Sequence, residues 1–164
     1  MRNNKKAFLV LILFLTACTS QPQPASPAPN AEGGNWVAFS ADKARTDQIL
    51  DWLFPGDAEY WSPIEADIHT LQSGLPVYLQ ENKSAFYMTD KSVWKQLDEY
   101  NSQYVGVVLD GRKVIYASYL CKNGVDTEWK EQFIFVADGG ECYFQFKFDT
   151  STGGFFDLLV NGEA

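Results

Sequence analysis

Histidine is almost absent from this 164-residue chain, in which His69 is the only one. A single imidazole and scattered carboxylates do not supply the ligand set of a zinc site, and no His-Glu-x-x-His run occurs. Asp138 and Glu141 enclose two glycines, but four residues cannot provide the roughly six oxygen ligands that calcium needs. The sequence therefore predicts no metal and no cofactor.

Nucleophile and phosphate motifs are also missing. No Gly-x-Ser-x-Gly elbow occurs, and the Ser-Thr-Gly-Gly run at residues 151–154 lacks the lysine and the frame of a phosphate-binding loop. His69 stands four residues after Glu65, off the apolar stripe of a predicted helix, so we expect it to face solvent; the alternative is an acid or base in a pocket. No catalytic residue is predicted, and an enzyme is the less favoured interpretation.

Basic residues are few: the chain has 13 lysines and arginines against 21 aspartates and glutamates, a net charge of −8. This balance excludes nucleic acid as a partner, because its phosphates would be repelled. Long apolar runs are missing as well. The run at residues 7–14 is too short to cross a bilayer, which takes about 20 apolar residues.

The N-terminal segment has the form of a signal peptide, in which three basic residues precede the apolar run. The run ends in Leu15-Thr16-Ala17-Cys18, which resembles the lipobox of bacterial lipoproteins. The resemblance implies cleavage before Cys18, a diacylglyceryl group on its sulfur, and a membrane anchor. Thr19, where inner-membrane members often carry aspartate, implies the outer membrane, facing the periplasm.

The mature chain divides into a tether and one domain. Removing residues 1–17 takes away three basic residues and no acidic one, which leaves a net charge of −11. Attachment then depends on the acyl chains of Cys18, because anionic lipid would repel the domain. Residues 18–35 hold four of the seven prolines and no large apolar side chain, which predicts a disordered tether. Residues 36–164 suffice for one domain with a substantial core.

Three helices are predicted in the first half of the domain. Ser40 and the apolar residues that follow at helical spacing indicate a helix over residues 41–54. Ser62-Pro63-Ile64-Glu65 offers a capping hydroxyl and a reciprocal glutamate, and it predicts a helix to about residue 80, kinked near Pro76. A third helix is expected over residues 91–100.

The second half has the composition of strands. A weak strand is expected at residues 85–88 and a stronger one at 104–109, after which Asp110-Gly111 supplies a hairpin turn. Four further strands are predicted, at residues 114–121, 132–137, 142–148 and 155–160. They would form an antiparallel meander, so the sequence predicts an α+β fold with helices packed on a curved sheet.

Alternation within residues 142–148 assigns the faces of one strand. Phe144, Phe146 and Phe148 should face the helices, and Gln145 and Lys147 should face water. The neighbouring strand is apolar on both sides at residues 133–136, which leaves a surface for another molecule to cover.

The order of these elements resembles the cone-shaped NTF2-like and cystatin-like folds, in which a curved sheet wraps around helices. Such folds host enzymes, ligand binders and assembly modules, so the resemblance assigns no activity. The Asn-Gly-Glu-Ala tail at residues 161–164 also resembles that of bacterial lipoproteins of unassigned activity.

Two cysteines remain besides Cys18, and two arguments about them disagree. In the oxidising periplasm Cys121 and Cys142 should pair. A strictly sequential meander opposes the bond, because a strand between them would separate them by about 20 Å, whereas a disulfide tolerates about 7 Å between Cα atoms. We expect the bridge, and free buried thiols are the alternative.

Aromatic side chains are the remaining functional resource. Trp and Tyr are favoured at protein interfaces, and a recognition surface is predicted from Trp61, Trp94, Tyr104, Tyr119, Trp129 and Tyr143. The alternative is that most of them fill the core. Three hypotheses follow: a non-enzymatic module that binds an envelope protein, a small-molecule or enzymatic pocket, and a purely structural surface lipoprotein. The first is preferred.

Overall fold

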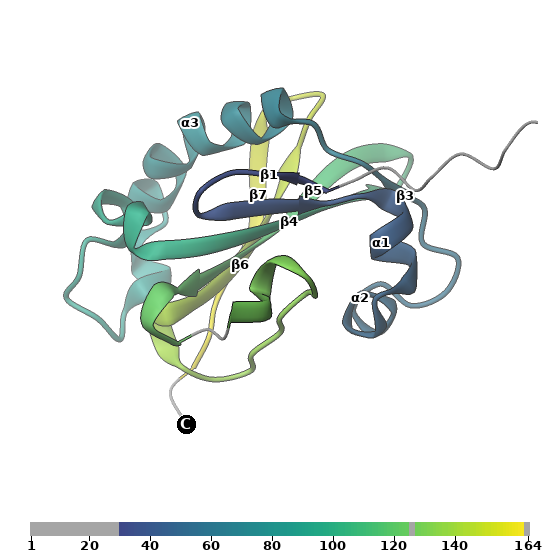
Figure 1. Cartoon of the computed structure of the whole chain (residues 1–164). Coiled ribbons are helices and arrows are strands. Elements are labelled where there is room, and N and C mark those ends of the chain that lie inside the picture. The colour runs from purple at the N-terminus through teal and green to yellow at the C-terminus, as the bar shows by residue number, and fades with distance from the viewer. Residues whose placement is uncertain (1–29, 125–126, 163–164) are drawn as a thin grey trace, which may run out of the picture.

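One seven-stranded sheet organises the domain, and the α+β class is confirmed by the computed structural model, which describes residues 30–124 and 127–162 (Figure 1). The strands are β1 (Ala31–Glu32), β2 (Trp36–Phe39), β3 (Tyr60–Trp61), β4 (Tyr100–Leu109), β5 (Arg112–Cys121), β6 (Tyr143–Asp149) and β7 (Gly154–Val160). Their order is β1-β2-β4-β5-β6-β7, with β3 also paired to β4. β2 runs parallel to β4, and the other pairs are antiparallel.

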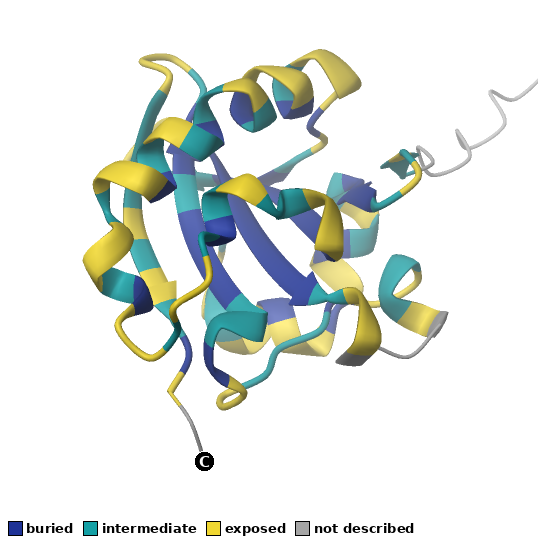
Figure 2. Ribbon diagram, turned by 90° about the vertical axis from the view of Figure 1, so that its left-hand side faces the viewer, coloured by how far each residue is buried: buried dark blue, intermediate teal, exposed yellow. Residues whose placement is uncertain are grey.

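Helices cover both faces of this sheet (Figure 1). On the upper face lies α3 (Glu65–Glu81), and against the lower face pack α1 (Ala41–Thr46) and α2 (Gln48–Leu53). Short 3-10 turns complete the described chain: Lys83–Phe86, Val93–Lys95, Leu97–Glu99, Lys122–Gly124, Thr127–Lys130 and Gly140–Cys142. The central strands are buried between these layers (Figure 2).

The predicted helix over residues 41–54 is wrong as a single element, because it divides at Asp47. Asp47 has extended backbone angles, φ −86° and ψ 121°, and its side chain accepts hydrogen bonds from the amides of Ile49 and Leu50. An aspartate that caps the next helix stabilises the break, since it satisfies amide groups that a helix start leaves without partners.

The second helix, α3, exists as one element, but it begins differently from the prediction. Asp67 accepts from the amide of Ile64 at 2.9 Å, while the Ser62 hydroxyl accepts from the amide of Ala41 at 2.9 Å. The serine therefore joins two segments instead of capping its own helix. The helix continues through Pro76 to Glu81.

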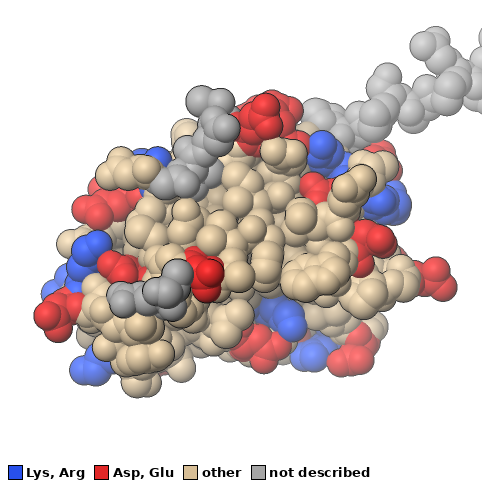
Figure 3. Space-filling view, turned by 90° about the horizontal axis from the view of Figure 1, so that it is seen from below, with Lys and Arg blue, Asp and Glu red and all other residues tan. Residues whose placement is uncertain are grey.

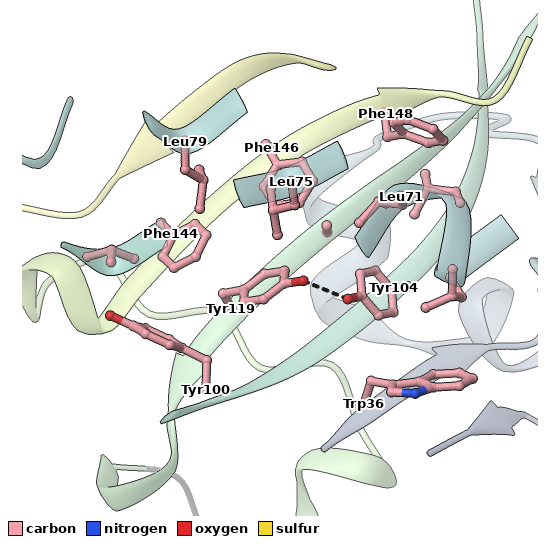
Figure 4. Packing of buried hydrophobic residues seen from close by; sticks show 14 of the residues in the cluster. Trp36, Leu71, Leu75, Leu79, Tyr100, Tyr104, Tyr119, Phe144, Phe146 and Phe148 are labelled. Carbon is pink, nitrogen blue, oxygen red and sulfur yellow. Dashed lines mark hydrogen bonds between the residues drawn. The ribbon is translucent and has the colours of Figure 1, made fainter. Parts of the chain in front are cut away.

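The apolar stripe of α3 meets the phenylalanines of β6, as predicted. Leu71, Leu75 and Leu79 are fully buried against the sheet, where Phe144 and Phe146 lie on the facing side (Figure 4). The expected helix at residues 91–100 is wrong, because this region forms two short 3-10 turns before β4 begins. The expected strand at residues 85–88 is also wrong, because Ala85 and Phe86 end a 3-10 turn. β4 instead begins at Tyr100, whose pairing with β5 overrides the local helical spacing.

The hairpin between β4 and β5 is confirmed. Asp110 and Gly111 have φ values of 51° and 75°, the left-handed angles that the predicted turn requires. The hairpin joins the two longest strands, which pair over ten residue pairs from Tyr100↔Cys121 to Leu109↔Arg112.

The largest departure from the meander is at residues 132–137, which form no strand. β5 pairs directly with β6, from Val114↔Asp149 to Leu120↔Tyr143. Residues 128–139, which we call the crossing segment, pass over the lower face of the sheet (Figure 1). Because β5 and β6 are neighbours in the sheet, Cys121 and Cys142 lie close enough to form a disulfide, with Cα atoms 4.8 Å apart. The bridge that the sequence favoured is therefore seen.

Order begins earlier than Trp36. β1 pairs with β2, and it lies within residues 18–35, where the sequence predicts tether. Lys130 of the crossing segment donates to Glu32 at 3.0 Å and to the carbonyl of Gly33 at 2.8 Å, which holds this strand against the domain. Residues 1–29, which hold the predicted signal peptide, Cys18 and the first part of the predicted tether, lie outside the described residues.

Candidate protein-binding surface

The crossing segment is held to the sheet through its backbone. Gln103 of β4 is fully buried; its amide nitrogen donates to the carbonyls of Trp129 and Gln132, and its amide oxygen accepts from the amide of Ile134 at 2.8 Å. Peptide groups that lack a strand partner need such bonds when they are buried. The side chain of Gln103 thus takes the place of the backbone hydrogen bonds that a neighbouring strand would make.

A second clamp lies at the other end of the crossing segment. Asn161 donates to the carbonyls of Val136 and Asp138, and it accepts from Gln145 at 3.1 Å. The predicted solvent exposure of Gln145 is therefore wrong, because only 5% of this residue is exposed. Its partner on the same face, Lys147, pairs with Asp157 at 2.9 Å.

Phe133 fixes the middle of the crossing segment. Its ring packs against Phe39 and Tyr116 of the sheet, with ring centroids 6.3 and 5.8 Å away, and its amide donates to Asp47 at 3.0 Å. Asp47 thus caps α2 and binds the crossing segment with the same carboxylate. Helix and segment are joined into one surface.

The outer side of this joined surface is apolar. Trp52 of α2 is 65% exposed and meets the ring of Phe135 edge-on, with centroids 5.1 Å apart. Ile134, Phe135 and Val136 are partly buried, and Ile49 is 37% exposed. These five residues are called the Trp52 patch below. Seen from below, this side of the molecule has a broad centre without charged side chains (Figure 3).

Acidic residues flank the Trp52 patch along the chain. Asp51 precedes Trp52, Glu131 precedes the apolar run of the crossing segment, and Asp138 follows it; all three are exposed. No ion pair is seen for these carboxylates among the described residues. They place three negative charges next to the patch along the chain.

The six aromatic residues predicted as a recognition surface do not lie together. Tyr104 and Tyr119 are wrong as surface residues, because both are buried beneath α3 and their hydroxyl oxygens are 2.8 Å apart (Figure 4). Trp61 and Trp94 pack against the upper core, and their indole nitrogens are buried without a hydrogen-bond partner in the described chain. The two others are at the lower side: Trp129 packs against the lower core, and Tyr143 is partly buried.

Burial keeps the core tyrosines protonated. Desolvation is the main cause that raises the pKa of Tyr104 and Tyr119, the latter well above 10.0. A hydroxyl that holds its proton this firmly does no acid–base chemistry near neutral pH. These side chains supply hydrogen bonds and packing.

His69 faces solvent, as the sequence predicts. It lies 3.2 Å from Glu65 on the outer side of α3, and both side chains are more than half exposed. The described residues contain no group of three His, Cys, Asp or Glu side chains placed to hold a metal ion. Within the same residues, no helix has both the length and the apolar character needed to cross a bilayer.

Comparison with known proteins adds no assignment. No family model, curated protein or solved structure matches the chain. The likeness to NTF2-like and cystatin-like folds therefore stays a prediction.

Trp52 and Ile49 were not predicted as surface residues, because their helical spacing served only to predict the helix over residues 41–54. The apolar run of the crossing segment gave a usable signal, because a strand with two apolar faces leaves one of them uncovered. That signal pointed to residues 133–136, of which 134–136 are partly exposed and Phe133 is buried, and it assigned them to a strand that does not form.

Proposed function

We propose that this chain is a lipoprotein of the bacterial outer membrane, tethered on the periplasmic side, whose domain binds another envelope protein through the Trp52 patch. The proposal includes no reaction. The observation that carries it is the exposed Trp52 ring, which meets Phe135 of the crossing segment edge-on. Large exposed aromatic side chains at the centre of an apolar face are typical of residues that dominate binding energy.

The patch is preorganised for binding. Gln103 and Asn161 fix the crossing segment at both ends, so little conformational entropy remains to be lost when a partner docks. A flexible apolar loop would lose more conformational entropy on binding, and in the free protein it would pack against its own domain. Rigid backbone anchors beneath an exposed tryptophan favour a docking surface over a packing defect.

Charge determines the kind of partner. The exposed carboxylates of Asp51, Glu131 and Asp138 favour a partner whose apolar surface is edged with lysine or arginine. The net charge of −11 on residues 18–164 acts in the same direction at longer range. Association should therefore slow as salt is added.

Photocrosslinking in intact cells tests the proposal. A photoreactive phenylalanine analogue is placed at position 52 of the full chain and, as a matched control, at position 87. Tyr87 is 81% exposed and lies after α3, away from the patch. An adduct is expected from position 52 alone, and its crosslinked peptide should combine apolar residues with lysine or arginine.

The purified partner then allows a binding measurement. Trp52→Ala should weaken the complex by about 2 kcal/mol, the size typical of a hot spot, while Tyr87→Ala should not change affinity. Equal adducts from both positions, or affinity that ignores Trp52, would show that the patch is not the docking surface.

The tether is tested separately through Cys18. Cys18→Ser should release the protein into the soluble fraction, because a domain with this negative charge has no affinity for anionic lipid. A variant that still sediments with outer membranes in the absence of detergent contradicts the lipid anchor.

A further inference from the structure

A cavity of about 240 Å³ opens beside α3, on the face of the sheet opposite to the Trp52 patch. It is lined by Asn35, Gln72, Leu97, Asp98, Ser102 and Tyr119. The volume is just below the range of about 300 to 1,000 Å³ for sites that hold drug-sized ligands. It exceeds the roughly 30 Å³ that one water occupies in the liquid several times over.

A small side chain in an aromatic environment creates this space. Ser102 lies on β4 between Tyr100 and Tyr104, which share its face, and it pairs across the sheet with Tyr119. Each of these neighbours carries a six-membered ring where Ser102 carries a single hydroxyl. The buried serine, 1% exposed, therefore leaves unfilled volume above it in an otherwise well-filled core.

The polar groups around the cavity are mostly acceptors. Gln72 donates its amide N–H to the Tyr104 hydroxyl at 3.2 Å, and Asn35 donates its own to the carbonyl of Tyr100 at 3.1 Å. No hydrogen bond within the described chain engages the amide oxygens of Gln72 and Asn35 or the carboxylate of Asp98. Three of the lining side chains thus have acceptor oxygens without a partner in the described chain.

The lining contains no lysine or arginine. An anion entering here would meet the Asp98 carboxylate and two carbonyl-type oxygens without any charged donor. A ligand rich in O–H and N–H groups would find partners for them, and the ring of Tyr119 and the side chain of Leu97 offer apolar contact to its carbon skeleton.

We propose that this cavity binds a small molecule that carries several hydroxyl groups and one ammonium group, of the class of amino sugars and amino polyols. The hydroxyls bond to the free acceptors, and the ammonium group pairs with Asp98 at the mouth. This activity is independent of the protein-binding function proposed above, since the two sites lie on opposite faces of the sheet.

Three sugars that differ mainly in charge test the proposal by calorimetry on the full-length chain: glucosamine, glucose and glucuronate. Glucosamine should bind more tightly than glucose by about fivefold, the value of one partly screened ion pair. Glucuronate should not bind measurably. Failure of all three to bind, or an affinity for glucuronate equal to that for glucosamine, overturns the proposal.

Two variants locate the binding. Ser102→Leu fills the cavity and should reduce glucosamine affinity at least tenfold, whereas Ser73→Leu, the same change at an exposed position on α3, should leave it unchanged. Asp98→Asn should remove the preference for glucosamine over glucose. Because Asp98 is exposed, this variant folds even if Ser102→Leu does not. Retention of the preference in Asp98→Asn places the ammonium group elsewhere and refutes the assignment.

Discussion

Gln103→Leu should detach the crossing segment while the sheet beneath it stays paired. The leucine keeps a buried side chain of similar size, but it removes the donor to the carbonyls of Trp129 and Gln132 and the acceptor for the amide of Ile134. At a net value of about 1 kcal/mol for each hydrogen bond, the loss is about 3 kcal/mol. This is a large fraction of the 5 to 15 kcal/mol by which typical domains are stable.

Urea unfolding and amide hydrogen exchange measure the two parts of this prediction. Gln103→Leu should lower the urea midpoint by the equivalent of about 3 kcal/mol. The Ile134 amide should lose its protection, while amides of the β4 and β5 ladder remain the slowest to exchange. Gln80→Leu is the matched control, because Gln80 is exposed on α3 and its substitution should fall within about 0.5 kcal/mol.

Equal urea midpoints for Gln103→Leu and the parent chain would refute this reasoning. So would an Ile134 amide that stays protected, since its only acceptor among the described residues is the amide oxygen of Gln103. Either result would mean that side-chain packing, and not the Gln103 clamp, holds the crossing segment.

Three further predictions concern the core, the disulfide and the response to pH. In urea melts, Phe146→Ala should destabilise the domain by about 3 to 5 kcal/mol, because the ring is buried in the core. Lys147→Ala should cost at most about 1 kcal/mol, because it removes only an exposed ion pair. The reverse order would mean that the two faces of β6 are assigned the wrong way round. Replacing both Cys121 and Cys142 by alanine opens a loop with a sequence separation of 21 and should cost about 3 kcal/mol, so an unchanged melting temperature would contradict the bridge. Desolvation raises the pKa of Tyr116 to about 12 from 10.0. The unfolded chain therefore loses this proton first, and stability should hold up to about pH 10 and fall between about pH 10 and 12; a stability that is flat across that window argues against a buried neutral Tyr116.

Local signals in the sequence were sufficient wherever one element determines its own structure. The Asp110-Gly111 turn requires positive φ angles, and the residues have them. The alternation around Phe144 and Phe146 needs only the twofold period of a strand, and it placed both rings beneath α3. In these cases the interactions that decide the structure lie within a few residues of one another.

The crossing segment could not be predicted in this way, because its partners are distant. Residues 132–137 have the apolar character of a strand, yet their peptide groups bond to Gln103 and Asn161, which lie about thirty residues before and twenty-five after them. The contact of Trp52 with Phe135 depends on the same arrangement, since it joins α2 to the crossing segment. The disulfide is explained by the same arrangement: because residues 132–137 do not form a strand, β5 and β6 are neighbours and their cysteines meet.

Gln103 and Asn161 bind the backbone N–H and C=O groups of the crossing segment, and these groups are present in every residue except proline, which lacks the N–H. These two residues therefore fix the path of the crossing segment through hydrogen bonds that do not involve the side chains at residues 134–136. The residues at those three positions could be substituted, by evolution or by design, while the hydrogen bonds of Gln103 and Asn161 to the backbone are kept. Only proline at position 134 is forbidden, because it lacks the N–H that Gln103 accepts. The same backbone could therefore present different side chains and so support new binding specificities.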